Sequence, residues 1–205
     1  MIKGKPNIIF QFRFELVGIE PLIWRCVQVP SKYSFWDLHV AIQDSMGWLD
    51  YHLHAFPVRM PRKRKLVEIG IPTDDYYDEP VLPGWEIPIT EYFTEPGKSA
   101  PYRYDFGDGW DHDVLLEGIL LKEEGVRYPK CVAGERACPP EDCGGVHGYY
   151  ELIKILKNPK HPEYRDHIEW LKGHAKNYYP YEPDQFNPEK VDFWDPKKRW
   201  KMAFS

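Results

Sequence analysis

The sequence predicts an α+β fold in which an antiparallel or mixed sheet with one covering helix forms the N-terminal half. A helical hairpin and an extended tail rich in aromatic residues and proline should form the C-terminal part. Three observations support this prediction: alternating apolar residues around one capped helix, amphipathic stretches after residue 146, and aromatic rings interspersed with prolines after residue 176. The length of 205 residues favours one domain over two.

The first expected element is a strand whose aromatic residues alternate with polar ones. Phe10, Phe12 and Phe14 are separated by single polar residues, and this period of two places the rings on one face of a strand. Glycine and proline within residues 18–21 then predict a turn, and residues 22–29 predict a second strand. The two strands should form an antiparallel hairpin.

A helix should follow the hairpin and lie across it. Ser34 is a suitable N-cap, and an apolar residue recurs every four positions at Leu38, Ile42 and Met46, which places these side chains on one helix face. Gly47 predicts the end of the helix, because glycine readily adopts the left-handed conformation found there.

The remaining elements follow from short apolar runs separated by turn residues. Four further strands are expected over residues 52–58, 66–71, 102–106 and 113–121. Residues 72–100, rich in proline and acidic residues, predict a surface excursion with one helical turn near Thr90. The helical hairpin should combine residues 147–157 with a second helix from about Pro162, and the aromatic rings of residues 177–205 should pin an extended strap.

The charge balance argues against a general nucleic-acid or membrane-surface protein. Both kinds of binding need a positive field, whereas the net charge is −5. One basic cluster is interpreted as a solvated turn that binds no nucleic acid: Arg59, Arg62, Lys63, Arg64 and Lys65. No stretch approaches the roughly 20 apolar residues of a membrane span. We therefore expect a cytoplasmic protein without a membrane partner, in which the four cysteines are reduced.

Two stretches contain side chains suited to a divalent metal ion. His52 and His54 lie two positions apart in an expected strand, so their rings should share one face. Further candidate ligands lie in or beside a glycine turn: Asp105, Asp108, Asp111 and His112. The alternatives are a pair of structural imidazoles and ordinary turn chemistry, in which Asp side chains bind backbone amides.

A second candidate ion site is a zinc centre with three thiolates and one imidazole. Its ligands would be Cys131, Cys138, Cys143 and His147. Their spacing lacks the Cys-x-x-Cys pattern of recognisable zinc sites, so buried or reactive thiols are the alternative. Within the same stretch, Glu141 and Asp142 are candidate catalytic residues that could act as a general base.

Three motifs carry a resemblance to a known family. They are WLDYHLHAF at residues 48–56, YDFGDGWDH at residues 104–112 and CPPEDCGGVHGY at residues 138–149. In this order they resemble the plasmid pRiA4b ORF-3-like family, over about residues 7–175. The resemblance implies an MM3350-like fold with its core in that range and a strap over residues 176–205. It also implies a link of some members to mobile elements, but no family-wide activity.

The sequence supports two functional hypotheses. No nucleophile with a base and an orienting group can be assembled, so the first is a non-catalytic binding or accessory module with a protein or small-molecule partner. The second is a metal-dependent hydrolase that uses the candidate ligands above. The hydrolase requires the motifs to meet in one cleft. We expect eight side chains to converge: His52, His54, Asp105, Asp108, Asp111, His112, Glu141 and Asp142.

Overall fold

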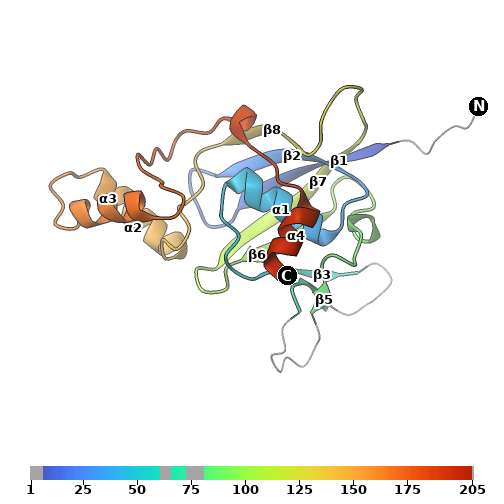
Figure 1. Cartoon of the computed structure of the whole chain (residues 1–205), viewed down its shortest axis with the longest axis horizontal. Helices are drawn as coiled ribbons and strands as arrows, with labels where there is room; N and C mark the ends of the chain where they lie inside the picture. Colours follow the sequence, from blue (N-terminus) through green and yellow to red (C-terminus); the bar gives the residue numbers. More distant parts are fainter. Residues whose placement is uncertain (1–6, 61–65, 73–80, 205) are drawn as a thin grey trace, which may run out of the picture.

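One sheet of eight strands forms the body of the part of the chain that the structure describes (Figure 1). The structure is a computed structural model and describes residues 7–60, 66–72 and 81–204. The strands are β1 (Ile8–Leu16), β2 (Trp24–Pro30), β3 (His54–Arg59), β4 (Leu66–Gly70), β5 (Leu82–Pro83), β6 (Ser99–Tyr104), β7 (Trp110–Leu121) and β8 (Lys130–Glu135). Their order in the sheet is β5-β4-β3-β6-β7-β1-β2-β8, and of these described strands only β4 and β5 pair in parallel.

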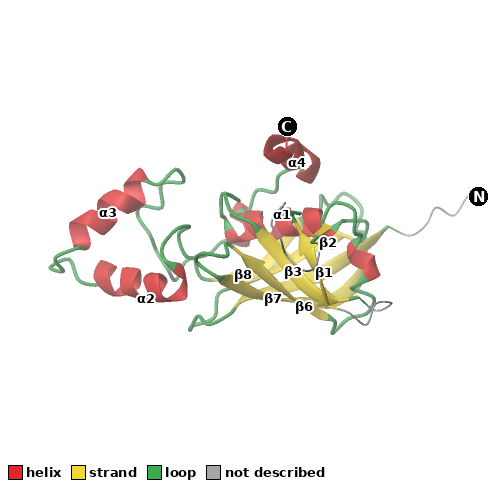
Figure 2. Ribbon diagram, turned by 90° about the horizontal axis from the view of Figure 1, so that it is seen from below, coloured by secondary structure: helices red, strands yellow, loops and turns green. Residues whose placement is uncertain are grey.

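Helices lie on one face of this sheet and beyond one end of it. They are α1 (Phe35–Met46), α2 (Gly145–Leu156), α3 (Tyr164–Gly173) and α4 (Pro196–Phe204), with short 3-10 turns η1 (Ile89–Glu91) and η2 (Pro188–Lys190). Helix α1 covers the sheet, and α4 lies over α1 (Figure 2). The predicted α+β fold with one covering helix in the N-terminal half is therefore confirmed.

The core lies between α1 and the face of the sheet that α1 covers. Burial alternates residue by residue along β6, as expected for a strand with one covered face. Aromatic rings fill the space, and Phe93 lies with its ring centroid 4.8 Å from that of Phe12 and 6.0 Å from that of Phe35. The predicted hairpin is present, with Phe12 opposite Val27. The rings of the first strand therefore point where their alternation predicts.

Both predicted ends of α1 are confirmed by their hydrogen bonds. The Ser34 hydroxyl accepts the Asp37 N–H at 3.2 Å, and the Asp37 carboxylate accepts the Ser34 N–H at 2.9 Å. This reciprocal pair is a capping box. Gly47 ends the helix with a φ of 87°, in the left-handed region.

Three elements differ from the sequence prediction. Strands β5 and β8 were not predicted, because β5 has two residues and β8 lies in a stretch interpreted as a cysteine loop. The C-terminal strap does not stay extended, since its last residues form α4. The Asp195 carboxylate accepts the backbone N–H groups of Lys197 and Lys198 and so begins this helix.

Some predicted features fall partly or wholly outside the described residues. The basic turn at Arg62, Lys63, Arg64 and Lys65 lies outside them, as does the part of the excursion over residues 73–80. The helical turn predicted near Thr90 is confirmed as η1. Within the described ranges, no helix is both long enough and apolar enough to cross a bilayer.

The predicted helical hairpin of α2 and α3 projects beyond the end of the sheet (Figures 1 and 2). We call residues 138–174 the arm. At its root, the Gly144 N–H donates to the Asp108 carboxylate at 3.0 Å, and the Glu20 N–H donates to the Tyr150 hydroxyl at 2.7 Å. A few polar contacts therefore join the arm to the turn between β6 and β7 and to the turn between β1 and β2.

Close packing at the root of the arm predicts that Gly148→Ala destabilises the protein. A Cβ atom at Gly148 would lie 1.9 Å from the carbonyl oxygen of Cys143, so the chain would have to move. We expect a loss of about 1–2 kcal/mol in unfolding free energy, measured by urea denaturation. Gly173→Ala is the matched control, because no atom lies within 4 Å of its added Cβ. Equal unfolding midpoints for the two variants would contradict the prediction.

Candidate functional site

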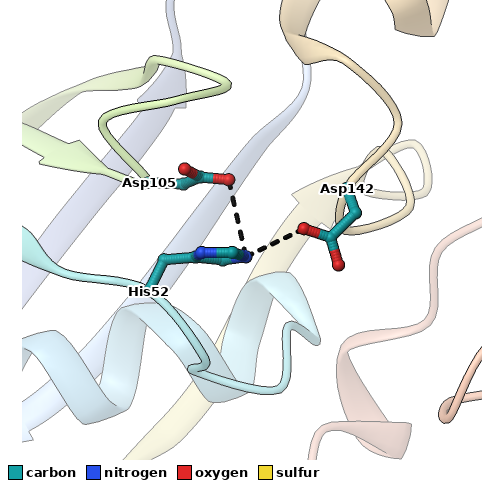
Figure 3. A group of neighbouring side chains, drawn as sticks. All are labelled: His52, Asp105 and Asp142. Atoms are coloured by element: carbon teal, nitrogen blue, oxygen red, sulfur yellow. Dashed lines mark hydrogen bonds and ion pairs between the residues drawn. The ribbon is translucent and has the colours of Figure 1, made fainter.

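Two candidate ligands, His52 and Asp105, and one candidate general base, Asp142, meet where the arm joins the sheet (Figure 3). Each of His52, Asp105 and Asp142 offers one ligand atom, and these three atoms lie within 4.8 Å of one another. His52 Nε2 is 2.9 Å from a carboxylate oxygen of Asp142 and 3.6 Å from one of Asp105. We call these three residues the cluster.

Each member of the cluster comes from a different segment. His52 lies between α1 and β3, Asp105 directly follows β6, and Asp142 lies in the loop before α2. Both aspartates adopt left-handed backbone conformations, with φ of 54° at Asp105 and 59° at Asp142. Aspartate is one of the few residues that tolerate this region, and such conformations often accompany functional sites. Local backbone geometry therefore helps to aim both carboxylates.

The two oxygens of the Asp105 carboxylate have separate roles. Oδ1 accepts the N–H groups of Gly107 at 2.9 Å and Asp108 at 3.3 Å, so the turn chemistry that was the alternative interpretation is present. Oδ2 is the oxygen that faces His52. The side chain of Asp105 is 9% exposed, whereas those of His52 and Asp142 are 31% and 49% exposed. The cluster is thus closed on the Asp105 side and open to solvent on the Asp142 side.

A buried carboxylate beneath the cluster joins the segments that supply it. Glu141 is fully buried, and its carboxylate accepts the Leu49 N–H at 2.7 Å and the Tyr104 hydroxyl. That hydroxyl in turn accepts the Tyr51 N–H at 3.0 Å. Burial and the bond to Glu141 raise the pKa of Tyr104 above its usual range, so the phenol stays protonated and donates. Because Tyr51 and Glu141 directly precede His52 and Asp142, this network positions two cluster residues.

One neighbour of the cluster was not found from the sequence. His174 follows α3, and its Nε2 lies 3.9 Å from the second oxygen of Asp142. Its ring packs against Tyr178 with a centroid separation of 4.8 Å, and the Tyr178 hydroxyl accepts the Glu141 N–H at 3.2 Å. His174 is outside the three motifs, and only the fold of the arm brings it close.

The other two histidine candidates lie in the core. Strand β3 begins at His54, so His52 is outside the strand and the prediction that both rings share one strand face is wrong. The His54 ring stacks on that of His39 at a centroid separation of 3.4 Å, and neither of its nitrogens has a hydrogen-bond partner within the described ranges. His112 is also buried, and its Nδ1 lies 3.1 Å from the Trp110 carbonyl.

The remaining acidic candidates have other partners. Asp111 forms a two-bond ion pair with Arg103, at 2.6 and 3.0 Å. Asp108 binds the Gly144 amide at the root of the arm. Glu141 has a protein donor on each carboxylate oxygen, so it supports the cluster from beneath instead of offering a free base. The expected convergence of eight side chains is therefore confirmed for three of them.

The proposed zinc ligands are not brought together. Cys131 lies in β8, Cys138 and Cys143 lie in the loop before α2, and His147 is exposed on α2. Among the described residues, the group of three or more His, Cys, Asp and Glu side chains close enough to share an ion is the cluster, which contains no cysteine. Burial raises the pKa of Cys131 to about 11 and that of Cys138 to about 12, which disfavours the thiolates that bind zinc.

Comparison with known proteins places the chain in a family. A family model described as plasmid pRiA4b ORF-3-like protein matches residues 8–190. The chain belongs to the plasmid pRiA4b ORF-3-like family. One family relative is the uncharacterized protein y4hQ of Sinorhizobium fredii, which is 32% identical over 163 residues, or 79% of this chain and 80% of that protein. The predicted resemblance is thus confirmed.

A solved structure has the same fold as this chain. The crystal structure of MM3350 from Methanosarcina mazei Go1, a protein of unknown function, matches with a TM-score of 0.80 and 41% sequence identity. The match covers 92% of this chain and all of that one. Neither relative is described with an activity, so the functional argument for this member of the pRiA4b ORF-3-like family rests on its own side chains.

Proposed function

We propose that this protein is a metal-binding module in which His52, Asp105 and Asp142 together hold one divalent transition-metal ion. The supporting observation is that their three ligand atoms lie within 4.8 Å of one another. Ions such as Zn²⁺ lie about 2.0–2.2 Å from nitrogen and oxygen ligands, so two ligands of one ion are about 3.0–3.5 Å apart. The separations of 2.9 and 3.6 Å from His52 Nε2 lie close to this range.

The donor set also favours a transition metal over Ca²⁺ or Mg²⁺. One imidazole nitrogen with two carboxylates suits Zn²⁺, Mn²⁺ or Fe²⁺, whereas Ca²⁺ and Mg²⁺ prefer oxygen ligands alone. The exposed side at Asp142 leaves room for a further ligand from water, a small molecule or a partner protein. This opening supports the binding-module hypothesis, with a protein or small-molecule partner at the metal.

A metal-dependent hydrolase is the second candidate, and one observation favours it. His174 lies next to Asp142 on the exposed side of the cluster, where an imidazole could accept a proton from a metal-bound water. The residues suggested as the base from sequence are poorly suited, because Glu141 is buried with two donors and Asp142 is a proposed ligand.

On the sequence grounds given above, we also propose a cytoplasmic location without nucleic-acid or membrane partners. The link to mobile elements stays a prediction.

The proposal predicts stoichiometric metal binding that depends on the cluster. Isothermal titration calorimetry with Zn²⁺ and with Mn²⁺ should show one binding site per chain. His52→Ala and Asp142→Asn should each weaken it at least tenfold, since each removes one of three protein ligands. Elemental analysis of protein purified without added metal gives an independent measurement.

Two exposed residues of the arm provide matched controls. His147→Ala and Asp166→Asn remove the same chemical groups away from the cluster, so binding should not change. The alternative explanation is that His52 lies between the two carboxylates because it forms a hydrogen bond and an ion pair with them, without any metal. If His52→Ala binds both ions as tightly as the unchanged protein, that simpler ion pair is the correct explanation.

A further inference from the structure

A cavity of about 1180 Å³ separates the last turn of α1 from the C-terminal strap. Its lining combines aromatic rings, among them Tyr178, Tyr181 and Phe186, with four cationic side chains: Arg25, Lys176, Lys190 and Arg199. The volume exceeds that of a simple ion and suits an organic molecule. None of the three cluster residues lines this cavity.

Arg25 contributes a buried positive charge that has no carboxylate partner among the described residues. The residue is 1% exposed, and its guanidinium donates to three backbone carbonyls, those of Ser45 at 2.9 Å, Trp24 at 2.8 Å and Glu135 at 2.9 Å. One face of the guanidinium lies over the Phe186 ring at 3.7 Å. The second terminal nitrogen, Nη2, makes no hydrogen bond within the described chain. An isolated buried charge of this kind is costly unless a counter-charge reaches it.

Lys176, an exposed residue, brings a second cationic group without an ion-pair partner among the described residues to the same cavity. Its Nζ lies beside Gly47, where an added Cβ would be 2.8 Å away, so the ammonium is next to the end of α1. The ammonium group of Lys176 forms no hydrogen bond or ion pair with the described residues. The aromatic ring it faces is that of Tyr178, with its centroid 5.9 Å from Nζ. Both cations are close enough to Cys138 to be influenced by its thiol. They therefore share one region of the cavity.

None of the described acidic residues of the cavity forms an ion pair with these two cations. Asp44 and Asp50 pair with Arg199, at 2.6 and 3.5 Å, and Asp44 and the buried Glu141 act on Lys176 only through longer-range electrostatic attraction. Glu182 and Asp192 also line the cavity, but both are exposed to solvent. Carbonyls at the end of α1 offset part of the charge. Burial lowers the pKa of Arg25, as expected for a cation withdrawn from water, whereas Lys176 is exposed.

We propose that this cavity binds an anionic organic molecule whose carboxylate or phosphate group lies between Arg25 and Lys176. The charged group would accept hydrogen bonds from Arg25 Nη2 and Lys176 Nζ, which form no hydrogen bond with the described residues. The apolar part of the ligand would contact the rings of Tyr178 and Tyr181, because planar rings in the walls favour a flat or aromatic body. The site contains none of the three cluster residues, so its test does not require a metal ion.

The test uses small probes that separate charge from the aromatic body. Phenyl phosphate, benzoate, inorganic phosphate and neutral phenol would each be titrated while tryptophan fluorescence is recorded, since Trp48 and Trp194 line the cavity. We expect saturable binding of phenyl phosphate or benzoate, and the tighter of the two identifies the preferred anion. Inorganic phosphate and phenol should each bind more weakly, because each lacks one of the two features.

The variant Lys176→Ala should weaken the better probe about tenfold, the effect of losing one charge-assisted hydrogen bond. Lys172→Ala is the matched control, because Lys172 is equally an exposed lysine but pairs with Glu169 at 2.9 Å and does not line the cavity. Circular dichroism of both variants checks that they fold. Arg25 is left unchanged, since its bonds to three carbonyls hold the chain together. If neither anion binds, if phenol binds as well as the anions, or if Lys176→Ala binds the better probe unchanged, the proposal fails.

Discussion

Acidification should destabilise the protein by about 3 kcal/mol through His112 alone. Burial lowers the pKa of His112 from 6.5 to about 4, so the folded state keeps this ring neutral in mild acid. The unfolded chain takes up a proton near pH 6.5. Below that pH the unfolded state therefore binds more protons, and the unfolding free energy falls until the folded-state pKa is reached. His54 acts in the same direction, because burial and its neighbour His39 lower its pKa well below the ordinary value.

Urea denaturation at several values between about pH 7 and about pH 4.5 measures this effect, and a histidine variant isolates it from the carboxylates. His112→Gln removes the titrating group, so its unfolding free energy should fall less steeply with acid than that of the unchanged protein. His167→Gln provides the control, since His167 lies on α3 away from the core. Parallel curves for the unchanged protein and His112→Gln would falsify the prediction.

Tyr104→Phe should cost about 3 kcal/mol of unfolding free energy, although it removes a single oxygen atom. The change leaves one oxygen of the fully buried Glu141 carboxylate without its donor, and it removes the acceptor of the Tyr51 N–H. The two affected residues, Glu141 and Tyr51, directly precede the cluster residues Asp142 and His52. The variant should therefore also bind Zn²⁺ more weakly.

A double-mutant cycle gives the sharper measurement of this bond. When Glu141 is already replaced by leucine, Tyr104→Phe no longer leaves a buried charge unpaired, so its added cost should drop well below that of the single change. Tyr179→Phe is the control, because Tyr179 is exposed and its hydroxyl makes no hydrogen bond with the described residues. Additive costs in the cycle would show that Tyr104 and Glu141 contribute independently.

Local patterns explain which parts of the fold could be predicted from the sequence. The alternation of Phe10, Phe12 and Phe14 reports a strand with one covered face, and the pair Ser34 and Gly47 reports both ends of α1. Strands β5 and β8 have no comparable pattern, because their pairing with β4 and β2 depends on partners distant in sequence. Helix α4 follows from the cap at Asp195 and from ring packing of Trp200 on Trp85, and its sequence was interpreted only as separate anchoring rings.

The sequence predicted the kinds of residue that form the candidate site, but it did not predict which of the eight candidates would come together. His52, Asp105 and Asp142 stood among eight candidates, and nothing in their spacing separates them from His54 or Asp111. The cluster residues differ from the other candidates in where β3 begins and in the left-handed conformations of the two aspartates, and neither feature can be read from the spacing. His174 could not be found because its approach to Asp142 depends on the folding of the whole arm.

The projection of the arm from the sheet has a mechanical consequence. Helix α2 contains 12 residues and is therefore about 18 Å long, so a rotation of roughly 5° at its root displaces its far end by about 1.6 Å. Asp142 lies at that root and His174 lies where the chain returns to it. A small rotation of the arm that accompanies a movement of Asp142 or His174 therefore produces a larger displacement at the far end of α2. A pair of spin labels, one at Lys160 in the turn between the helices and one on the sheet, would report small movements at the root as a change in the distance between the labels.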